Sequence, residues 1–176
     1  MEDTHRTKRK VQRKLSAGCL LFHGKGKKRK YLLLHYGAGH WDFVKGEIEE
    51  GERPLETALR ELEEETGIKK DQVRQIPGFK EKIHFMFRDK WTKSKVKPLI
   101  SKYVYFFLFE SKTTKVKLSE HTDFTWLKYE EAVEKATFKT AKDLLRKAEA
   151  FLNRSFLNRY EREVVEKQKI KRKGPA

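Results

Sequence analysis

The sequence predicts a single α/β domain, and three of its features support this class. Its length of 176 residues suits one domain with a sizeable core. Apolar runs bounded by glycine or charged residues predict strands, most clearly over residues 15–22, 31–36 and 102–110. Apolar residues at helical spacing predict helices over residues 54–66 and 140–152. Strands followed by helices in this way indicate a sheet that the helices cover.

Four weaker patterns complete the expected order of elements. Alternating apolar and polar residues over 83–87 predict a half-buried strand, and residues 115–118 predict the start of a short one. Residues 129–136 predict a short helix before the final one. The glycine- and lysine-rich segment 24–30 predicts a hairpin loop between the first two strands.

Two basic segments flank the domain, which we place at residues 15–152. Residues 1–14 carry six Lys or Arg side chains and few apolar ones, which predicts a flexible basic arm. Residues 153–176 predict an extension of the last helix with a partial apolar face and a basic tail. Packing on the domain or on a partner subunit is the first interpretation of this extension, and RNA contact is the second. The sequence leaves open whether the protein is a monomer or a dimer.

The composition narrows the class of protein. The net charge of +16 favours polyanionic partners, although solubility or a thermophilic host would explain it equally well. The single cysteine, Cys19, excludes an internal disulfide and an all-cysteine zinc site, and its apolar neighbours predict a buried packing role.

No run approaches the roughly 20 apolar residues of a membrane span, and the N-terminus lacks an apolar signal segment. We therefore expect no membrane association and a reducing, cytoplasmic setting.

The stretch from Gly46 to Ile68 carries the strongest functional signal. Its first part is punctuated by glycine and is typical of a loop. Pro54 suits the first turn of a helix, where its missing N–H costs nothing, and Gly67 suits the left-handed residue that ends one. The apolar residues between them fall on one stripe, which we expect to face a core.

Acidic side chains lie beside that apolar stripe. Glu61 and Glu65 are one helical turn apart with Glu64 next to them, and three carboxylates this close repel one another unless a cation lies between them. Oxygen ligands suit Mg²⁺ or Mn²⁺, and Glu52 in the preceding loop is placed to reach the same ion. A solvated acidic helix face is the common alternative. Arg60, four residues before Glu64, favours the metal site because it can steer the carboxylates.

This stretch resembles the Nudix box, G-x5-E-x7-R-E-U-x-E-E-x-G-U, in which U is a bulky aliphatic residue. The resemblance implies a Nudix hydrolase, with an α/β/α sandwich, a mixed central sheet and a catalytic loop–helix. Such enzymes cleave a nucleoside diphosphate linked to another group and use divalent metal. By this resemblance Glu61, Glu64 and Glu65 hold the metal, and one of them, with Glu61 and Glu64 as the candidates, also activates the attacking water. The chain matches every defined position of the box, at Gly46, Glu52, Arg60, Glu61, Leu62, Glu64, Glu65, Gly67 and Ile68.

Segments outside the box resemble one branch of this family, the asymmetrical diadenosine tetraphosphate hydrolases. They are AGCLLF, YLLLHY, GFKEKIHF and the run from VKLSEHTDF to KDLL, and together they span roughly residues 16–152. The branch implies cleavage of diadenosine tetraphosphate to ATP and AMP. It also implies that Glu120 contributes to metal binding or catalysis and that His40 contacts phosphate. Lys45, just before the box, would place a positive charge beside the phosphates, with an ordinary exposed lysine as the equal alternative.

Aromatic residues near the site hold an adenine in this branch. One such position, usually a tyrosine, is Phe85 here, so its ring is available for stacking but its hydroxyl is absent. Phe124 and Phe138 occupy other aromatic positions of the branch. The resemblance therefore implies a base-binding set of Phe85, Phe124 and Phe138.

Two other functions stay open on the sequence. An RNA 5′-end pyrophosphohydrolase or decapping enzyme would use the basic arms and the loop over residues 88–98, where Trp91 lies among lysines. An RNA-binding protein with an inactive Nudix fold is the third interpretation, and the intact box argues against it.

Overall fold

The computed structural model describes residues 11–89, 92–93 and 97–172, with side chains as far as Ser155. Trp91 and the first ten residues of the predicted basic arm lie outside the described residues. Among the helices that the structure describes, none is long and apolar enough to cross a membrane.

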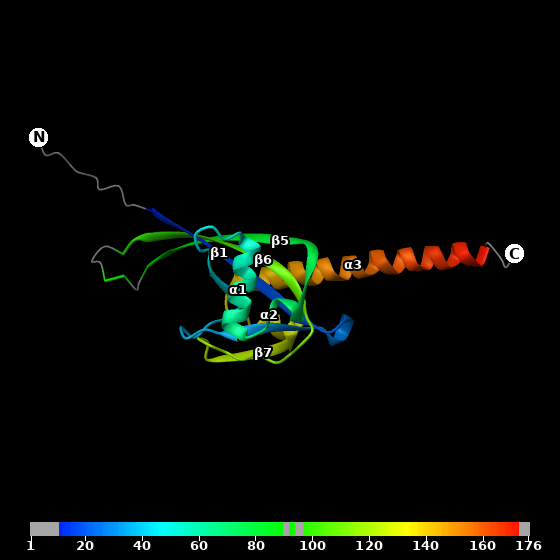
Figure 1. The fold of residues 1–176 in the computed structure, drawn as a ribbon, viewed down its shortest axis with the longest axis horizontal. Helices are drawn as coiled ribbons and strands as arrows, with labels where there is room; N and C mark the ends of the chain where they lie inside the picture. Colours follow the sequence, from blue (N-terminus) through cyan, green and yellow to red (C-terminus); the bar gives the residue numbers. More distant parts are fainter. Residues whose placement is uncertain (1–10, 90–91, 94–96, 173–176) are drawn as a thin grey trace, which may run out of the picture.

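A seven-stranded mixed sheet forms the centre of the fold (Figure 1). Five strands lie in the order β3–β2–β1–β6–β5, while β4 pairs with β1 and β7 pairs with β2. Strands β1 and β6 run parallel, and the other pairs run antiparallel. The strands are β1 (Val11–His23), β2 (Lys30–His35), β3 (Trp41–Asp42), β4 (Val44–Glu47), β5 (Val73–Arg88), β6 (Leu99–Ser111) and β7 (Asp123–Lys128).

Helices cover both faces of the sheet, which confirms the predicted α/β/α sandwich. Helix α1 (Pro54–Thr66) packs on one face, where Ala58 and Leu62 join a buried cluster from β1, β2 and β6. Helices α2 (Tyr129–Lys135) and α3 (Lys139–Arg172) pack on the other face over a second cluster. Figure 1 shows α3 leaving the body in one direction, while the paired ends of β1, β5 and β6 extend in the other.

One edge of β1 is shared by two strands. Its C-terminal end pairs with β2 through Phe22 and His23, whereas its middle pairs with β4 over Ser16 to Cys19. The pairing of β4 with the middle of β1 places β4 directly against α1. Gly18 allows this close pairing, because a Cβ at this position would lie 2.1 Å from the carbonyl oxygen of Val44.

Helix α1 has the predicted boundaries. Pro54 begins it, and the carboxylate of Glu56 accepts the backbone N–H of Arg53 at 2.9 Å, which satisfies one of the free donors at the start of the helix. Gly67 ends it with φ of 67°, a left-handed conformation that favours glycine. Cys19 is buried as predicted and its thiol donates to the carbonyl of Ala58 at 3.0 Å, which ties β1 to α1.

Some of the predicted strands were wrong in their extent, and one is absent. Strand β6 begins at Leu99 rather than at residue 102. Strand β1 begins at Val11 rather than at residue 15, because its parallel pairing with β6 continues back to the pair Val11–Leu99. Residues 115–118 form no strand. They run as a loop past the end of α1, where the N–H of Lys117 donates to the carbonyl of Thr66 at 2.8 Å.

Candidate active site

Arg60 of α1 gathers three carboxylates around one guanidinium group. Its Nε donates to Glu52 at 2.7 Å and its Nη2 donates to the second oxygen of Glu52 at 3.0 Å. Its Nη1 donates to Glu61 at 2.7 Å and to Glu64 at 2.9 Å. Nη2 also donates to the carbonyl of Glu47 on β4. The predicted steering role of Arg60 therefore has a geometric basis, since it joins the loop, β4 and the helix.

Glu52 is the carboxylate most firmly held by this arrangement. Its two oxygens accept the fork of Arg60, and one of them also accepts the hydroxyl of Thr57 at 2.7 Å. These hydrogen bonds from Arg60 and Thr57 lower the pKa of Glu52 to about 2. Glu52 is thus ionised at any physiological pH and is already engaged by a cation.

Glu61 lies against the backbone of Gly46. A Cβ built on Gly46 would lie 1.8 Å from a carboxylate oxygen of Glu61, so a side chain at Gly46 would displace this carboxylate. Burial raises the pKa of Glu61, Arg60 opposes this shift, and the charges of Glu64 and Glu120 add to it. The first glycine of the motif is therefore needed for the position of a carboxylate.

Glu65 is a nearly buried carboxylate, 7% exposed, one turn from Glu61. Its Oε2 accepts the backbone N–H of Lys45 at 3.2 Å, and its Oε1 lies 2.9 Å from Nε2 of His121. Burial raises the pKa of Glu65 to about 8; Lys45 opposes the shift, while the charges of Glu61 and Glu120 add to it. A carboxyl group with this pKa keeps its proton near neutral pH, and a bound cation would stabilise its ionised form.

Glu120 reaches the same cluster from the loop before β7. Its side chain is exposed, and its charge acts on Glu61, Glu65 and His121. A glutamate far from the motif in sequence thus lies near enough for its charge to act on the carboxylates of the motif. Its part in metal binding or catalysis stays a prediction. His121, the next residue, was missed by the sequence reasoning even though it follows a residue that was singled out.

Lys45 is not the exposed lysine that the sequence left as an alternative. Its side chain is 14% exposed, and its Nζ lies 2.9 Å from Asp42 and 4.0 Å from the centre of the Tyr36 ring. The ammonium group is therefore held inside the site, between a carboxylate and an aromatic face.

Tyr36 is the residue that organises this cationic side of the site, and the sequence reasoning missed it. Its ring stacks on His40 at 4.7 Å and contacts His121 at 4.2 Å, in addition to Lys45. Its hydroxyl donates to the carbonyl of Phe43 at 2.7 Å. Its place at the end of an apolar strand, beside the glycine-rich loop, was the available signal.

A model of the NUDIX domain matches residues 12–148 of this chain. The chain belongs to the Nudix family. The bis(5′-nucleosyl)-tetraphosphatase (asymmetrical) of Mus musculus is 38% identical over 128 residues, covering 70% of this chain and 80% of that protein. An RNA pyrophosphohydrolase of Sulfurovum sp. is 32% identical over 104 residues, covering 56% and 64% respectively. A crystal structure of a Caenorhabditis elegans Ap4A hydrolase binary complex has a TM-score of 0.68 and 30% identity, and covers 80% of this chain and 98% of that one.

The three aromatic residues predicted to hold a base do not all lie on one face of the sheet. Phe138, 45% exposed, contacts the ring of His40 at 5.0 Å, and Phe85 packs against the core beneath α2 and α3. Phe124 packs against the core beneath α1, on the opposite face of the sheet. The structure therefore does not bring Phe124 together with Phe85 on one face.

Lys102 of β6 is a second residue that the sequence reasoning missed. Its side chain is half-buried, and among the described residues none forms an ion pair with it. Burial lowers its pKa; the charges of Lys45 and Lys14 add to this shift, and those of Glu47 and Glu61 oppose it. Lys102 is paired in register with Phe85, so it places a cation beside a candidate base-stacking ring. The sequence analysis did not single out Lys102, because the strand around it was predicted from its apolar residues.

The donor set of the Nudix helix fits a hard divalent cation, the cofactor that family membership implies. Carboxylate oxygens are the ligands that such cations prefer, and Glu61, Glu64 and Glu65 supply them within one helical turn. Within the described parts of the chain, no three His, Cys, Asp or Glu side chains already surround a position for a metal ion. Instead, the guanidinium of Arg60 lies between Glu52, Glu61 and Glu64 and donates to all three.

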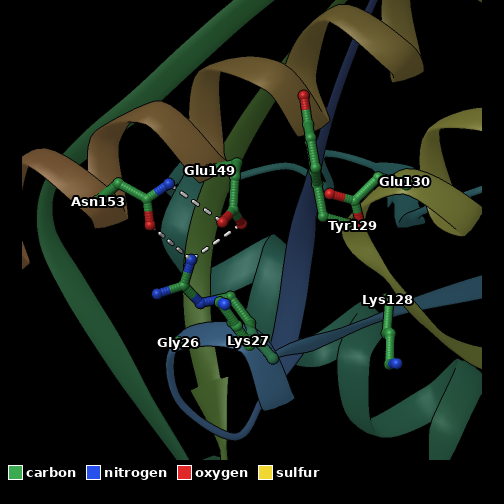
Figure 2. A pocket seen from close by; sticks show the side chains of 8 residues that line it. Gly26, Lys27, Lys128, Tyr129, Glu130, Glu149 and Asn153 are labelled. Atoms are coloured by element: carbon green, nitrogen blue, oxygen red, sulfur yellow. Dashed lines mark hydrogen bonds and ion pairs between the residues drawn. The ribbon is translucent and has the colours of Figure 1, made fainter.

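A separate cavity of about 260 Å³ lies between the β1–β2 loop and α3 (Figure 2). Glu149 and Asn153 of α3 turn toward it from one side. None of its lining residues belongs to the Nudix loop–helix. They are Gly26, Lys27, Arg29, Lys128, Tyr129, Glu130, Glu149 and Asn153.

Proposed function

We propose that this Nudix protein hydrolyses diadenosine tetraphosphate to ATP and AMP with Mg²⁺ or Mn²⁺. The single observation that carries the chemistry is the cluster of carboxylates on α1, gathered by Arg60 and lying beside Lys45. The choice of substrate is supported by the name of the Mus musculus relative, a bis(5′-nucleosyl)-tetraphosphatase, and by the C. elegans Ap4A hydrolase.

Three carboxylates of the helix would hold the metal, namely Glu61, Glu64 and Glu65. The bound ion would neutralise the polyphosphate oxygens, and it would lower the pKa of a bound water. Glu52, predicted as a further ligand, faces the same guanidinium as Glu61, and in our proposal it fixes Arg60 and joins the metal only when Arg60 moves aside. Arg60 then serves as the positioning residue for all of these carboxylates.

A proton must leave the attacking water as it approaches phosphorus. Glu64 and Glu120 are the exposed carboxylates of the cluster, so we propose Glu64 as the acceptor and Glu120 as the alternative. Glu61 and Glu65, which are more buried, are better suited to ligation than to proton exchange with solvent.

Cationic side chains would stabilise the polyphosphate and the phosphate that leaves. Lys45 and Lys102 supply the charge from β4 and β6. Burial and the charge of Lys45 lower the pKa of His40, so the neutral imidazole offers an N–H to phosphate. Phe138 beside His40, and Phe85 beside Lys102, are the proposed stacking partners of an adenine. Phe124, on the other face of the sheet, is the weakest member of the predicted set.

A product assay tests this function. Purified protein with Mg²⁺ or Mn²⁺ is offered diadenosine tetraphosphate and, separately, RNA with a 5′-triphosphate. We expect ATP and AMP in equal amounts, formed much faster than phosphate or pyrophosphate is released from the RNA. The second candidate, an RNA 5′-end pyrophosphohydrolase, is supported by the Sulfurovum relative, which matches a smaller part of this chain. Preferential release from the RNA would replace the first function by the second.

Two expectations on the setting stay predictions. Cell fractionation checks the cytoplasmic location, and light scattering decides between a monomer and a dimer.

A further inference from the structure

Strands β1, β6 and β5 continue beyond the body of the domain as a three-stranded ribbon (Figure 1). Pairing between β1 and β6 runs without interruption from Val11–Leu99 onward. Pairing between β6 and β5 is equally regular from Phe107–Lys80 to Leu99–Arg88. Regular pairing means that side chains along each strand alternate between two faces of the ribbon.

The two faces of the ribbon have different partners. Ile83 packs against the core beneath α2 and α3, and Glu81 binds Lys147 of α3 at 2.5 Å. The alternate residues Lys80 and Lys82 point to the other face, where α3 does not reach. We call that side the ribbon face, and we define it by Arg13 of β1, Lys80, Lys82 and His84 of β5, and Tyr103 and Tyr105 of β6.

Over the residues that the structure describes, the ribbon face is basic and carries no acidic side chain. In the described strand segments 11–17, 80–88 and 99–105, the one acidic residue is Glu81, and it points to the opposite face. Lys80, Lys82 and Arg13 are exposed, and Arg88 continues the row near the end of β5. From Lys80 to Arg88 the surface extends over about 27 Å, at the rise of a β-strand.

Aromatic rings lie among these cations. Nζ of Lys82 is 4.4 Å from the centre of the Tyr103 ring, and Nζ of Lys80 is 5.3 Å from that of Tyr105. His84 stacks on Tyr103 with ring centres 4.3 Å apart and planes 19° apart. Tyr103 and Tyr105 are partly exposed and each has an ammonium group over its ring, while His84 is exposed. A nucleotide presents the matching pair, a flat base and a phosphate.

We propose that the ribbon face binds single-stranded nucleic acid, with bases on Tyr103, Tyr105 and His84 and phosphates on the lysines. A duplex lacks the free bases that these rings would stack on, so the single strand is the form that fits. This surface lies on the same side of the sheet as α1, since Tyr105 packs against the cluster beneath that helix. It is made of other residues than the hydrolytic site, because its lysines and His84 contact Tyr103 and Tyr105, whereas Phe85 and Lys102 lie on the opposite side of the same strands. Binding there does not depend on which polyphosphate the enzyme cleaves.

Fluorescence anisotropy with labelled oligonucleotides tests the proposal. The probes are oligouridylate of about 12 nucleotides with a 5′-hydroxyl, which offers no phosphoanhydride to cleave, oligothymidylate of equal length, and a duplex RNA. We expect both single strands to bind more tightly than the duplex. The ratio of the affinities for oligouridylate and oligothymidylate then shows whether RNA or DNA is preferred.

The decisive comparison uses two variants with the same net charge. Lys80→Gln/Lys82→Gln removes two cations from the ribbon face, while Lys27→Gln/Lys28→Gln removes two exposed cations from the β1–β2 loop. Because each phosphate contact contributes about 0.7 to the salt dependence for single strands, the first variant should reduce the slope of log K against log salt by about 1.4. The second should leave the slope unchanged. Neither pair lies in the hydrolytic site, so tetraphosphate hydrolysis should persist in both.

A third variant tests stacking separately from charge. Tyr103→Leu keeps an apolar side chain of similar reach, and we expect it to weaken single-strand binding about fivefold or more. Circular dichroism verifies that it folds; if it does not, the lysine comparison decides alone. The proposal is overturned if the wild-type protein binds no oligonucleotide at about 50 mM salt. Equal losses in the two lysine variants, or tighter binding of the duplex, would also overturn it.

Discussion

Two arginine-centred networks lie on opposite faces of the same sheet, one around Arg60 and the other around Arg29. On the α1 side, the guanidinium of Arg60 faces three carboxylates within 2.9 Å and is 23% exposed. On the α3 side, Arg29 is 9% exposed and donates to one carboxylate, Glu149, at 2.9 Å and to the amide oxygen of Asn153 at 3.3 Å. Glu149 also accepts the hydroxyl of Tyr31 at 2.6 Å.

The difference between the networks is charge balance. Arg29 and Glu149 neutralise each other, and their hydrogen bonds join the β1–β2 region to α3. The Arg60 network has more carboxylates than its guanidinium neutralises, and Glu65 adds another in a nearly buried place. A balanced pair holds a fold together, whereas a surplus of carboxylates costs stability until a cation arrives. We therefore expect the same residue types to serve structure in one place and chemistry in the other.

Removing a carboxylate from the Arg60 network or its neighbour Glu65 should have the largest effect on activity. We expect Glu64→Gln and Glu65→Gln each to lower kcat on diadenosine tetraphosphate by at least about a hundredfold. The fold should persist, since glutamine keeps the shape and removes repulsion. The matched control is Glu63→Gln, an exposed neighbour on the same helix, which should retain nearly full activity. Turnover like that of the wild type in either test variant would contradict the metal assignment.

Breaking the balanced network should have the opposite signature. Glu149→Gln leaves the buried Arg29 without its counter-charge and should lower the free energy of unfolding by about 2–3 kcal/mol. We expect kcat and KM to stay close to those of the wild type. Urea denaturation followed by fluorescence measures the first quantity. A large loss of activity with unchanged stability would show that the two networks are coupled through the sheet.

A divalent cation should distinguish the networks directly. Mg²⁺ at a hundred times its Kd should stabilise the folded protein by about 2.7 kcal/mol, because it binds the folded state alone. Thermal melts with added Mg²⁺ and with EDTA measure this gain. The gain should persist in Glu149→Gln, which leaves the surplus intact, and largely disappear in Glu65→Gln. An equal gain in both variants would place the ion elsewhere.

The sequence predicted the first of these networks and not the second, for a physical reason. Glu61, Glu64 and Glu65 lie within one helical turn, so helical periodicity alone brings them together. The Arg29–Glu149 pair joins residues 120 positions apart, which no local pattern reveals. His121, Tyr36 and Lys102 were missed for the same reason, because sheet pairing and loop packing give them their neighbours. The sheet order and the additional strand residues 11–14 likewise depend on pairing with distant β6.

The smallest effect should come from a single hydroxyl group in the balanced network. Tyr31→Phe removes the hydrogen bond to Glu149 and no ring contact, so we expect a loss of about 1 kcal/mol in the free energy of unfolding. The loss should be small because Glu149 keeps Arg29 and Asn153 as partners. In the background of Glu149→Gln, the same substitution should cost less, since the charged acceptor is already gone. Urea denaturation of the four proteins of this cycle measures the coupling. Additive losses in the free energy of unfolding would mean that Tyr31 and Glu149 stabilise the fold independently of each other.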